Sequence, residues 1–214
     1  MPTAKSNVRP PQQKRSKASF ERVLGAARQV LEEEGYASFT IARVSERAGV
    51  SIGSIYARVP SKDALFHEVH ARAMQEIGEQ YESIAEAESR SDLPTPELIA
   101  ETIRLFAQPF KAHMPFLRVV MHRGAVDDHV ATFGSRVSSE QAEQFRSVVL
   151  TRRDEIVHPD PELAADVAYR MVYCTLARQV MYGPTFESQN LIEWDDLVTE
   201  LANAVSAYLL GPRS

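Results

Sequence analysis

The stretch from Thr40 to Lys62 constrains the fold of this 214-residue chain more than any other part of the sequence. Thr40 can cap a short helix, because a hydroxyl at this position accepts a hydrogen bond from a free backbone N–H of the first turn. Gly49 is expected to end that helix in the left-handed conformation, and Ser51 to cap a second helix over residues 52–59. Two short helices joined by such a turn are typical of the helix-turn-helix, whose second helix enters the major groove of DNA.

The residues around this turn resemble the DNA-binding signature of the tetracycline-repressor (TetR) family, over about residues 15–70. The matching residues are a helical stripe ending at Gly35-Tyr36 (Phe20, Val23, Leu24, Ala27, Val30, Leu31), then Phe39-Thr40, Ala48-Gly49-Val50-Ser51, Gly53, Tyr56, Val59 and Pro60–Leu65. Three positions depart from the family pattern. Ser45 stands where the family usually has Ala, Ile52 where a polar or basic residue is common, and Arg58 where His is frequent. These departures do not change the predicted fold. They do mean that the DNA sequence of the operator is not predicted by the resemblance.

Eight residues are candidates for DNA binding, in two groups. Thr40, Tyr56, Lys62 and Arg58 are the candidates for phosphate contact, and Ser51, Ile52, Gly53 and Ser54 for base contact. The resemblance implies the phosphate role of the first three; Arg58 lies near the helix end, where a phosphate is the expected partner. The base readers are small, apart from Ile52, so their helix can approach the base edges closely. Thr40 could also be a simple cap, and Tyr56 a core aromatic with an exposed tip.

Charge is distributed unevenly between the two ends of the chain. Residues 1–62 hold 11 Lys and Arg against 5 Asp and Glu, although the whole chain carries a net charge of −5. A basic first third on an acidic remainder indicates that only the first third contacts a polyanion.

The predicted fold is all-α, because apolar residues recur at helical spacing and strand-like alternation is absent. We expect a three-helix DNA-binding domain over residues 15–62 and a larger bundle of about six helices over residues 63–214. Residues 1–14, basic and rich in proline, are expected to be disordered, as an arm that touches DNA or as a solubilising tail. Longer helices are predicted at about residues 61–89, 96–110, 130–157, 162–182 and 194–210, with a kink or end at Pro109.

Aromatic and soft side chains in the middle of the second domain could enclose a small molecule. The candidates are Phe106, Phe110, Phe116, Met121, Phe133, Gln144, Tyr169 and Tyr173. Such a stripe describes a filled core equally well. Nearby residues that could bind a polar or acidic ligand group are His113, His122, Lys111, Arg118 and Arg123, although a solvated face explains the cations as well.

The last two helices carry apolar stripes that, by the resemblance, pair with a second copy as a four-helix bundle. The candidate interface residues are Leu163, Val167, Met171, Trp194, Leu197, Leu201, Val205 and Tyr208. The alternative is that these stripes fill the core of one chain. Cys174 is the single cysteine, so no disulfide within the chain is possible, and we expect a buried thiol.

Together these features predict a dimeric one-component transcriptional regulator, by resemblance a repressor. It would bind a palindromic operator in double-stranded DNA and be released by a largely apolar small-molecule effector. Phosphate loops, nucleophile elbows and metal triads are missing from the sequence, so we predict no enzyme activity, cofactor or metal site. No apolar run could span a membrane and no signal core is visible, which predicts a cytoplasmic protein with no membrane partner. The alternatives are a constitutive DNA-binding or interaction module without a ligand and, from another class, an all-α enzyme.

Overall fold

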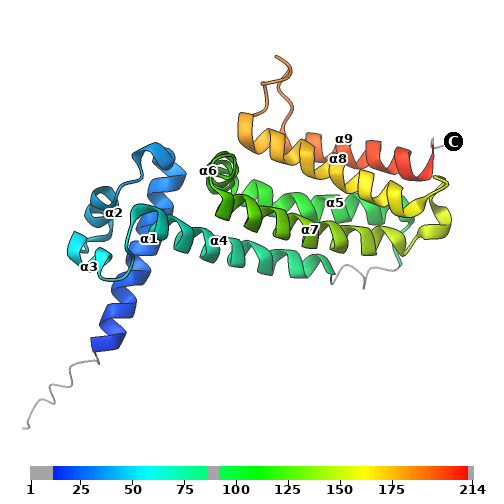
Figure 1. Cartoon of the computed structure of the whole chain (residues 1–214). Coiled ribbons are helices and arrows are strands. Elements are labelled where there is room, and N and C mark those ends of the chain that lie inside the picture. The colour runs from blue at the N-terminus through cyan, green and yellow to red at the C-terminus, as the bar shows by residue number, and fades with distance from the viewer. Residues whose placement is uncertain (1–11, 86–91, 212–214) are drawn as a thin grey trace, which may run out of the picture. The chain divides into compact units, whose positions relative to one another are not determined.

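The computed structural model describes residues 12–85 and 92–211, and the side chains of residues 16–81 and 92–211. Every regular element within these residues is a helix, which confirms the predicted all-α fold (Figure 1). The chain divides into two compact units between Arg72 and Ala73. This division falls inside helix α4 (Lys62–Ala85), whereas the second domain was expected to begin at the start of that helix.

The first unit contains α1 (Gln12–Ser38), α2 (Ile41–Ala48), α3 (Ile52–Tyr56) and the beginning of α4. The fully buried apolar side chains come from the predicted stripe and its packing partners: Ala27, Val30, Leu31, Phe39, Val44, Ile55, Leu65 and Phe66. The ring of Phe66 lies edge-on to that of Tyr36, with 5.1 Å between centroids. Gly35 interrupts α1 with φ 75°, at the Gly35-Tyr36 position where the first helix was predicted to end.

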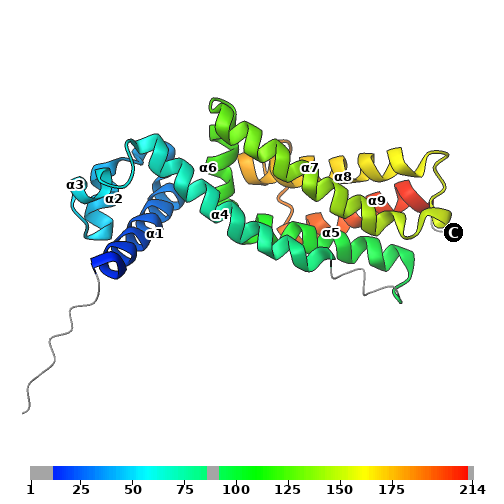
Figure 2. The same cartoon turned by 60° about the horizontal axis from the view of Figure 1, so that its bottom comes forward.

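The second unit contains the rest of α4 together with α5 (Thr95–Ala112), α6 (Met114–Gly124), α7 (Asp128–Leu150), α8 (Pro161–Tyr182) and α9 (Trp194–Leu210). A short 3₁₀ turn, η2, spans Arg153–Glu155. Helices α5, α7, α8 and α9 run alongside one another, while α6 crosses at one end (Figures 1 and 2). Phe106, Phe116, Phe145, Leu176 and Leu209 fill the space between them.

Several helix limits differ from the prediction because local signals decide them. Helix α3 ends at Tyr56, three residues before the predicted end at Val59. Helix α7 begins after Asp127, whose carboxylate caps the helix by accepting from the N–H of Val130. The helix ends at Leu150, whereas its end was predicted near residue 157. Pro109 lies inside α5, which continues to Ala112. A proline there removes one hydrogen bond close to the end of the helix, where the loss is tolerated.

Two further expectations need correction. Helix α1 already begins at Gln12, inside the segment 1–14 that was expected to be disordered; residues 1–11 lie outside the described part of the chain. Cys174 is exposed rather than buried. Small and apolar residues such as Ala168, Val172 and Leu176 form the inward face of α8, and Cys174 lies on the opposite face. Among the described residues no helix is long and apolar enough to cross a membrane.

Candidate nucleic-acid interface and ligand cavity

Hydrogen bonds within the turn between α2 and α3 hold its shape. The Thr40 hydroxyl accepts from the N–H of Arg43 at 3.2 Å, and Gly49 adopts φ 62° and ψ 36°, the left-handed conformation that suits glycine. The hydroxyl of Ser45 donates to the carbonyl of Val50 at 2.6 Å, while the N–H of Val50 donates back to the carbonyl of Ser45 at 3.2 Å. The Ser45 departure from the family pattern therefore ties the end of α2 to the turn.

Helix α3 presents small side chains outward and is held by one buried residue. Ile55 is fully buried and Val59, just after the helix, is 6% exposed, whereas Ile52 is 44% exposed. The Ser51 hydroxyl accepts from the N–H of Ser54 and lies 2.8 Å from its hydroxyl. The first turn, residues 51–54, therefore presents hydroxyls, a glycine backbone and one aliphatic side chain to a partner.

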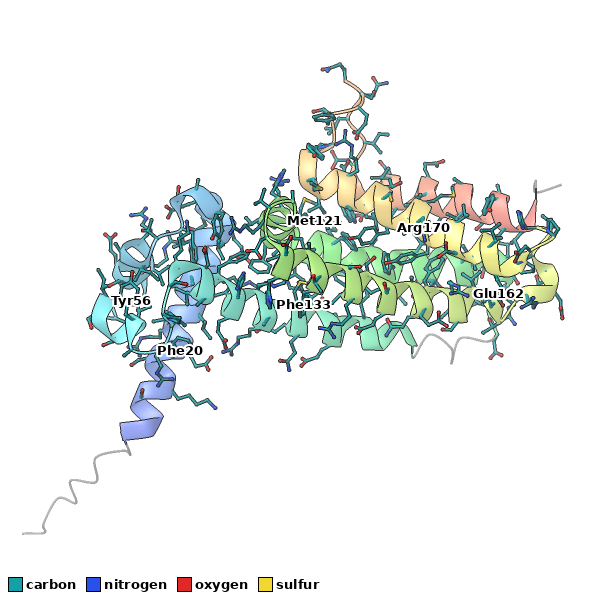
Figure 3. All side chains as sticks on the ribbon, in the orientation of Figure 1. Phe20, Tyr56, Met121, Phe133, Glu162 and Arg170 are labelled. Atoms are coloured by element: carbon teal, nitrogen blue, oxygen red, sulfur yellow. The ribbon has the colours of Figure 1, made fainter. Side chains whose placement is uncertain are left out.

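Tyr56 ends this helix and is half exposed, at 51%. Figure 3 labels Tyr56 at the end of α3 and, for orientation, Phe20 on α1. Tyr56 is therefore an exposed residue rather than a core aromatic with only its tip in solvent.

Two predicted phosphate-binding cations are held by contacts within the unit. The guanidinium of Arg58 lies 5.2 Å from the centroid of the Phe20 ring and donates to the Ser16 hydroxyl. The ammonium of Lys62 lies 4.2 Å above the Tyr36 ring and donates to the Tyr36 carbonyl at 3.3 Å. Cation–π contacts of this kind orient a cation without neutralising it, so both retain charge for an anionic partner.

A cavity of about 360 Å³ lies within the second unit, between α4, α5, α6, α7 and α8. Its lining is dominated by apolar side chains: Met74, Ile77, Tyr81, Phe110, Leu117, Val120, Met121, Val130, Ala131, Val137, Ala177 and Met181. The remaining lining residues are Gly124, Gly134, Ser135, Ser138, Gln141 and Tyr173. A volume of this size lies within the usual range for small-molecule pockets.

The polar part of the lining comes mainly from one face of α7. Ser135, Ser138 and Gln141 follow one another at helical spacing. The hydroxyl of Tyr169, behind the lining, donates to the Ser138 carbonyl at 2.8 Å and lies 2.9 Å from the Ser138 hydroxyl. Burial raises the pKa of Tyr169 to about 12 and also raises the pKa values of Tyr81 and Tyr173, so all three hydroxyls are protonated near neutral pH.

The cavity brings together three of the eight side chains expected to bind a ligand: Phe110, Met121 and Tyr173. Phe106 and Phe116 are buried in the packed core instead, at 2% and 0% exposure. Phe133 packs beneath the guanidinium of Arg136 at 4.8 Å, at the same end of the bundle as Met121 (Figure 3). Gln144 and Tyr169 also do not line the cavity. Residues that sequence reasoning missed include Gln141 and Ser138, for which helical spacing on α7 was the available signal.

The charged and imidazole groups expected near a ligand do not line the cavity. Lys111 pairs with Asp195 at 2.8 Å, Arg118 donates to the Val180 carbonyl at 2.7 Å, and Arg123 pairs with Asp127 at 3.2 Å. A ring nitrogen of His113 lies 3.0 Å from the Gln80 amide, and His122 packs against the Tyr182 ring.

The outer faces of α8 and α9 carry most of the candidate interface residues. Leu163 is 52% exposed at the start of α8 and follows Glu162, whose position Figure 3 labels. The partly exposed residues on these faces are Val167, Met171, Trp194, Leu197 and Tyr208. Leu201 and Val205 are instead 9% and 0% exposed, so both belong to the core of the subunit. Both lie in the buried apolar cluster of the second unit and are removed from the candidate interface.

A helix-turn-helix with an outward-facing α3, followed by a helical unit with an apolar cavity, is an architecture of transcriptional regulators that carry a separate ligand-binding domain. Sequence comparison gives the family. The model of the bacterial regulatory proteins of the tetR family matches residues 23–69, and that of the tetracyclin repressor-like C-terminal domain matches residues 94–209. The chain belongs to the TetR family of transcriptional regulators, with its DNA-binding and C-terminal ligand-binding domains. Comparison with curated proteins gives no match.

Solved structures support the fold at low sequence identity. A transcriptional regulator from Rhodococcus sp. Rha1 is 18% identical with a TM-score of 0.66, over 89% of this chain and 96% of that chain. A TetR transcription regulator from Haloarcula marismortui is 14% identical with a TM-score of 0.65, over 90% and 97%. The fatty acid degradation regulator FadR from Bacillus halodurans is 16% identical with a TM-score of 0.61, over 90% and 95%.

Proposed function

We propose that the protein is a homodimeric repressor that binds a palindromic DNA operator and is released from it by a small-molecule effector in the α4–α8 cavity. The exposed first turn of α3, anchored by the buried Ile55, is the observation that carries this proposal. A regulator of this kind acts in the cytoplasm, where its operator lies.

Contacts to DNA fall into base and phosphate groups. Ser51, Ile52, Gly53 and Ser54 face the base edges: the hydroxyls can donate or accept, and Ile52 suits a thymine methyl. Thr40, Tyr56, Arg58 and Lys62 face the phosphates. The excess of Lys and Arg over Asp and Glu in residues 1–62 supports this division, because neutralisation of phosphates supplies much of a protein's affinity for DNA.

Dimerisation is supported by the apolar outer faces of α8 and α9. Leu163, Val167 and Met171 follow one another at i, i+4 spacing on α8, and Leu197 and Tyr208 extend the apolar surface on α9. A two-fold dimer places its recognition helices on half-sites about one DNA turn (~34–36 Å) apart. The effector would act by binding one dimer conformation more tightly than the other.

Fluorescence anisotropy with DNA from upstream of the protein's own and neighbouring genes tests the proposal. We expect specific binding that weakens steeply with salt, and at least a tenfold loss for Tyr56→Ala with the dimer intact. Tyr182→Ala, which removes an exposed tyrosine of the second unit, is the matched control and should leave DNA binding unchanged. Equal binding to operator and random DNA at ~0.15 M salt contradicts the proposal.

The second candidate is a constitutive DNA-binding module without an effector. The open cavity argues against it, because filled cores leave few voids larger than a water molecule. A reporter gene placed behind the operator separates repression from activation, since deletion of the regulator raises expression only in the first case.

A further inference from the structure

Gln141 is the one amide side chain among the described residues that line the cavity. It lies in the middle of α7, is 8% exposed and lines the cavity. The side-chain amide makes no hydrogen bond with the described residues, and its nitrogen and oxygen are not sealed in the core. Gln144, one turn further on, is more exposed and does not line the cavity.

The Gln141 amide lines the cavity, where water can hydrate it in the absence of a ligand. A ligand that displaces this water must supply hydrogen bonds in its place, because an amide left unpaired in an apolar site is unfavourable. The amide offers two donors and one acceptor, so it can bind a carbonyl, hydroxyl or amide group of a ligand.

The neighbouring Ser138 adds an acceptor rather than a donor. Tyr169 donates its proton to the Ser138 carbonyl, so the contact between the two hydroxyls must use the Ser138 proton. The Ser138 hydroxyl oxygen retains lone pairs that can accept a hydrogen bond, and Ser138 lines the cavity. Ser138 and Gln141 together form a small neutral polar patch in an otherwise apolar lining.

Among the residues that the structure describes, no charged side chain lines the cavity. Lys111, Arg118 and Arg123 are engaged with Asp195, the Val180 carbonyl and Asp127, away from the cavity. Burial of an ionised group without a counter-charge is strongly unfavourable. Three methionines, Met74, Met121 and Met181, can adapt to different apolar shapes.

We propose that the effector is an uncharged, largely apolar molecule with one carbonyl, hydroxyl or amide group, which the Gln141 amide binds. This proposal rests on the proposed function, because it specifies the ligand class of the same cavity. Carboxylates and amines that are ionised at neutral pH are excluded as effectors.

Competition with the neutral fluorescent probe N-phenyl-1-naphthylamine on the full-length protein tests the proposal. Four eight-carbon competitors differ only in their end group: 2-octanone, 1-chlorooctane, octanoate and octylammonium. At pH 7 we expect 2-octanone to bind at least about tenfold more tightly than octanoate and octylammonium. Gln141→Met should weaken 2-octanone by about 3–10-fold and leave 1-chlorooctane unchanged, since only the ketone loses a hydrogen bond.

Gln144→Met is the matched control and should leave all four affinities unchanged. Gln141→Leu repeats the test if Gln141→Met does not fold. The proposal is overturned if octanoate competes as well as 2-octanone. It is also overturned if Gln141→Met leaves the ratio of 2-octanone to 1-chlorooctane affinity unchanged, or if the probe does not bind the folded protein.

These measurements use no DNA, so they separate the two proposals. If 2-octanone binds through Gln141 but no neutral ligand releases the operator, the ligand class stands and the proposed regulation fails. If DNA release occurs with charged ligands only, the regulation stands and the ligand class fails.

Discussion

The Ser45 hydroxyl donates to the Val50 carbonyl at 2.6 Å and so links the end of α2 to the turn that precedes α3. This partly buried hydrogen bond fixes the point from which α3 departs, and therefore the direction in which residues 51–54 face.

Replacement of Ser45 by Ala should cost about 0.5–1 kcal/mol of unfolding free energy. The loss of a hydrogen bond of about 0.5–1.5 kcal/mol is partly offset by the better helix propensity of Ala. Urea unfolding measures the change. Ser139→Ala is the control, because its exposed hydroxyl donates only to the Ser135 carbonyl of its own helix; an equal effect of the two changes would contradict the role of Ser45.

Gly49→Ala should destabilise the protein by about 1–2 kcal/mol, since its φ of 62° is unfavourable for a residue with a Cβ. No heavy atom lies within 4 Å of a Cβ built at this position, so the cost is one of backbone conformation. Thermal unfolding measures it.

Gly53→Ala provides the contrast within the same motif. It lies in α3, where a Cβ would also meet nothing within 4 Å. Stability should be unchanged or higher by up to about 1 kcal/mol, because Ala favours helix. Operator affinity should fall, since the added methyl group keeps the helix from the base edges. Unchanged affinity would remove Gly53 from the proposed base contacts.

Stability should fall at alkaline pH through the buried tyrosines of the second unit. Burial raises the pKa of Tyr169 to about 12, above the value near 10 of the unfolded chain. Folding therefore favours the protonated form of Tyr169. The stability that this preference adds is fully present below pH 10 and is lost as the pH rises toward 12. Tyr81 and Tyr173 shift in the same direction.

Unfolding in urea between pH 8 and 11.5 tests this dependence. Tyr169→Phe cannot ionise there and should flatten the decline, although it also loses the hydrogen bond to Ser138. Tyr182→Phe, at an exposed tyrosine, should leave the pH dependence as in the wild type. A decline that is identical in all three proteins would exclude Tyr169 as a contributor.

Leu163→Glu should weaken the proposed dimer by at least about tenfold, because the charge would be buried against the second copy. Sedimentation velocity measures the association, and operator affinity should fall in parallel. Val126→Glu is the matched control, with an aliphatic side chain that is 74% exposed between α6 and α7. If the two variants associated equally strongly, the dimer interface would not include Leu163 at the start of α8.

Local features of this fold could be predicted from sequence because neighbouring residues determine them. The caps at Thr40 and Ser51 and the left-handed Gly49 depend on contacts within a few residues, and the structure confirms all three. The early end of α3 could not be foreseen, because Val59 continues the apolar spacing of Ile55 although it lies beyond the helix.

The cavity was harder to predict because helical spacing identifies an inward face but does not say whether that face is filled. Phe106 and Phe110 lie one turn apart on α5, yet only Phe110 borders the cavity. Leu201 and Val205 were assigned to an interface by the same spacing that places them in the core. Gln141 was missed because helical spacing groups it with Ser135 and Ser138 on one face of α7 but does not say that this polar face borders a cavity.

The exposed position of Cys174 gives the protein a chemical reporter of its own assembly. The thiol lies on the α8 face that also carries Met171, and it is the only thiol in the chain. A maleimide or disulfide reagent would therefore modify each chain once, and the reaction rate would measure how much of that face remains open to solvent as protein concentration, operator and effector are varied.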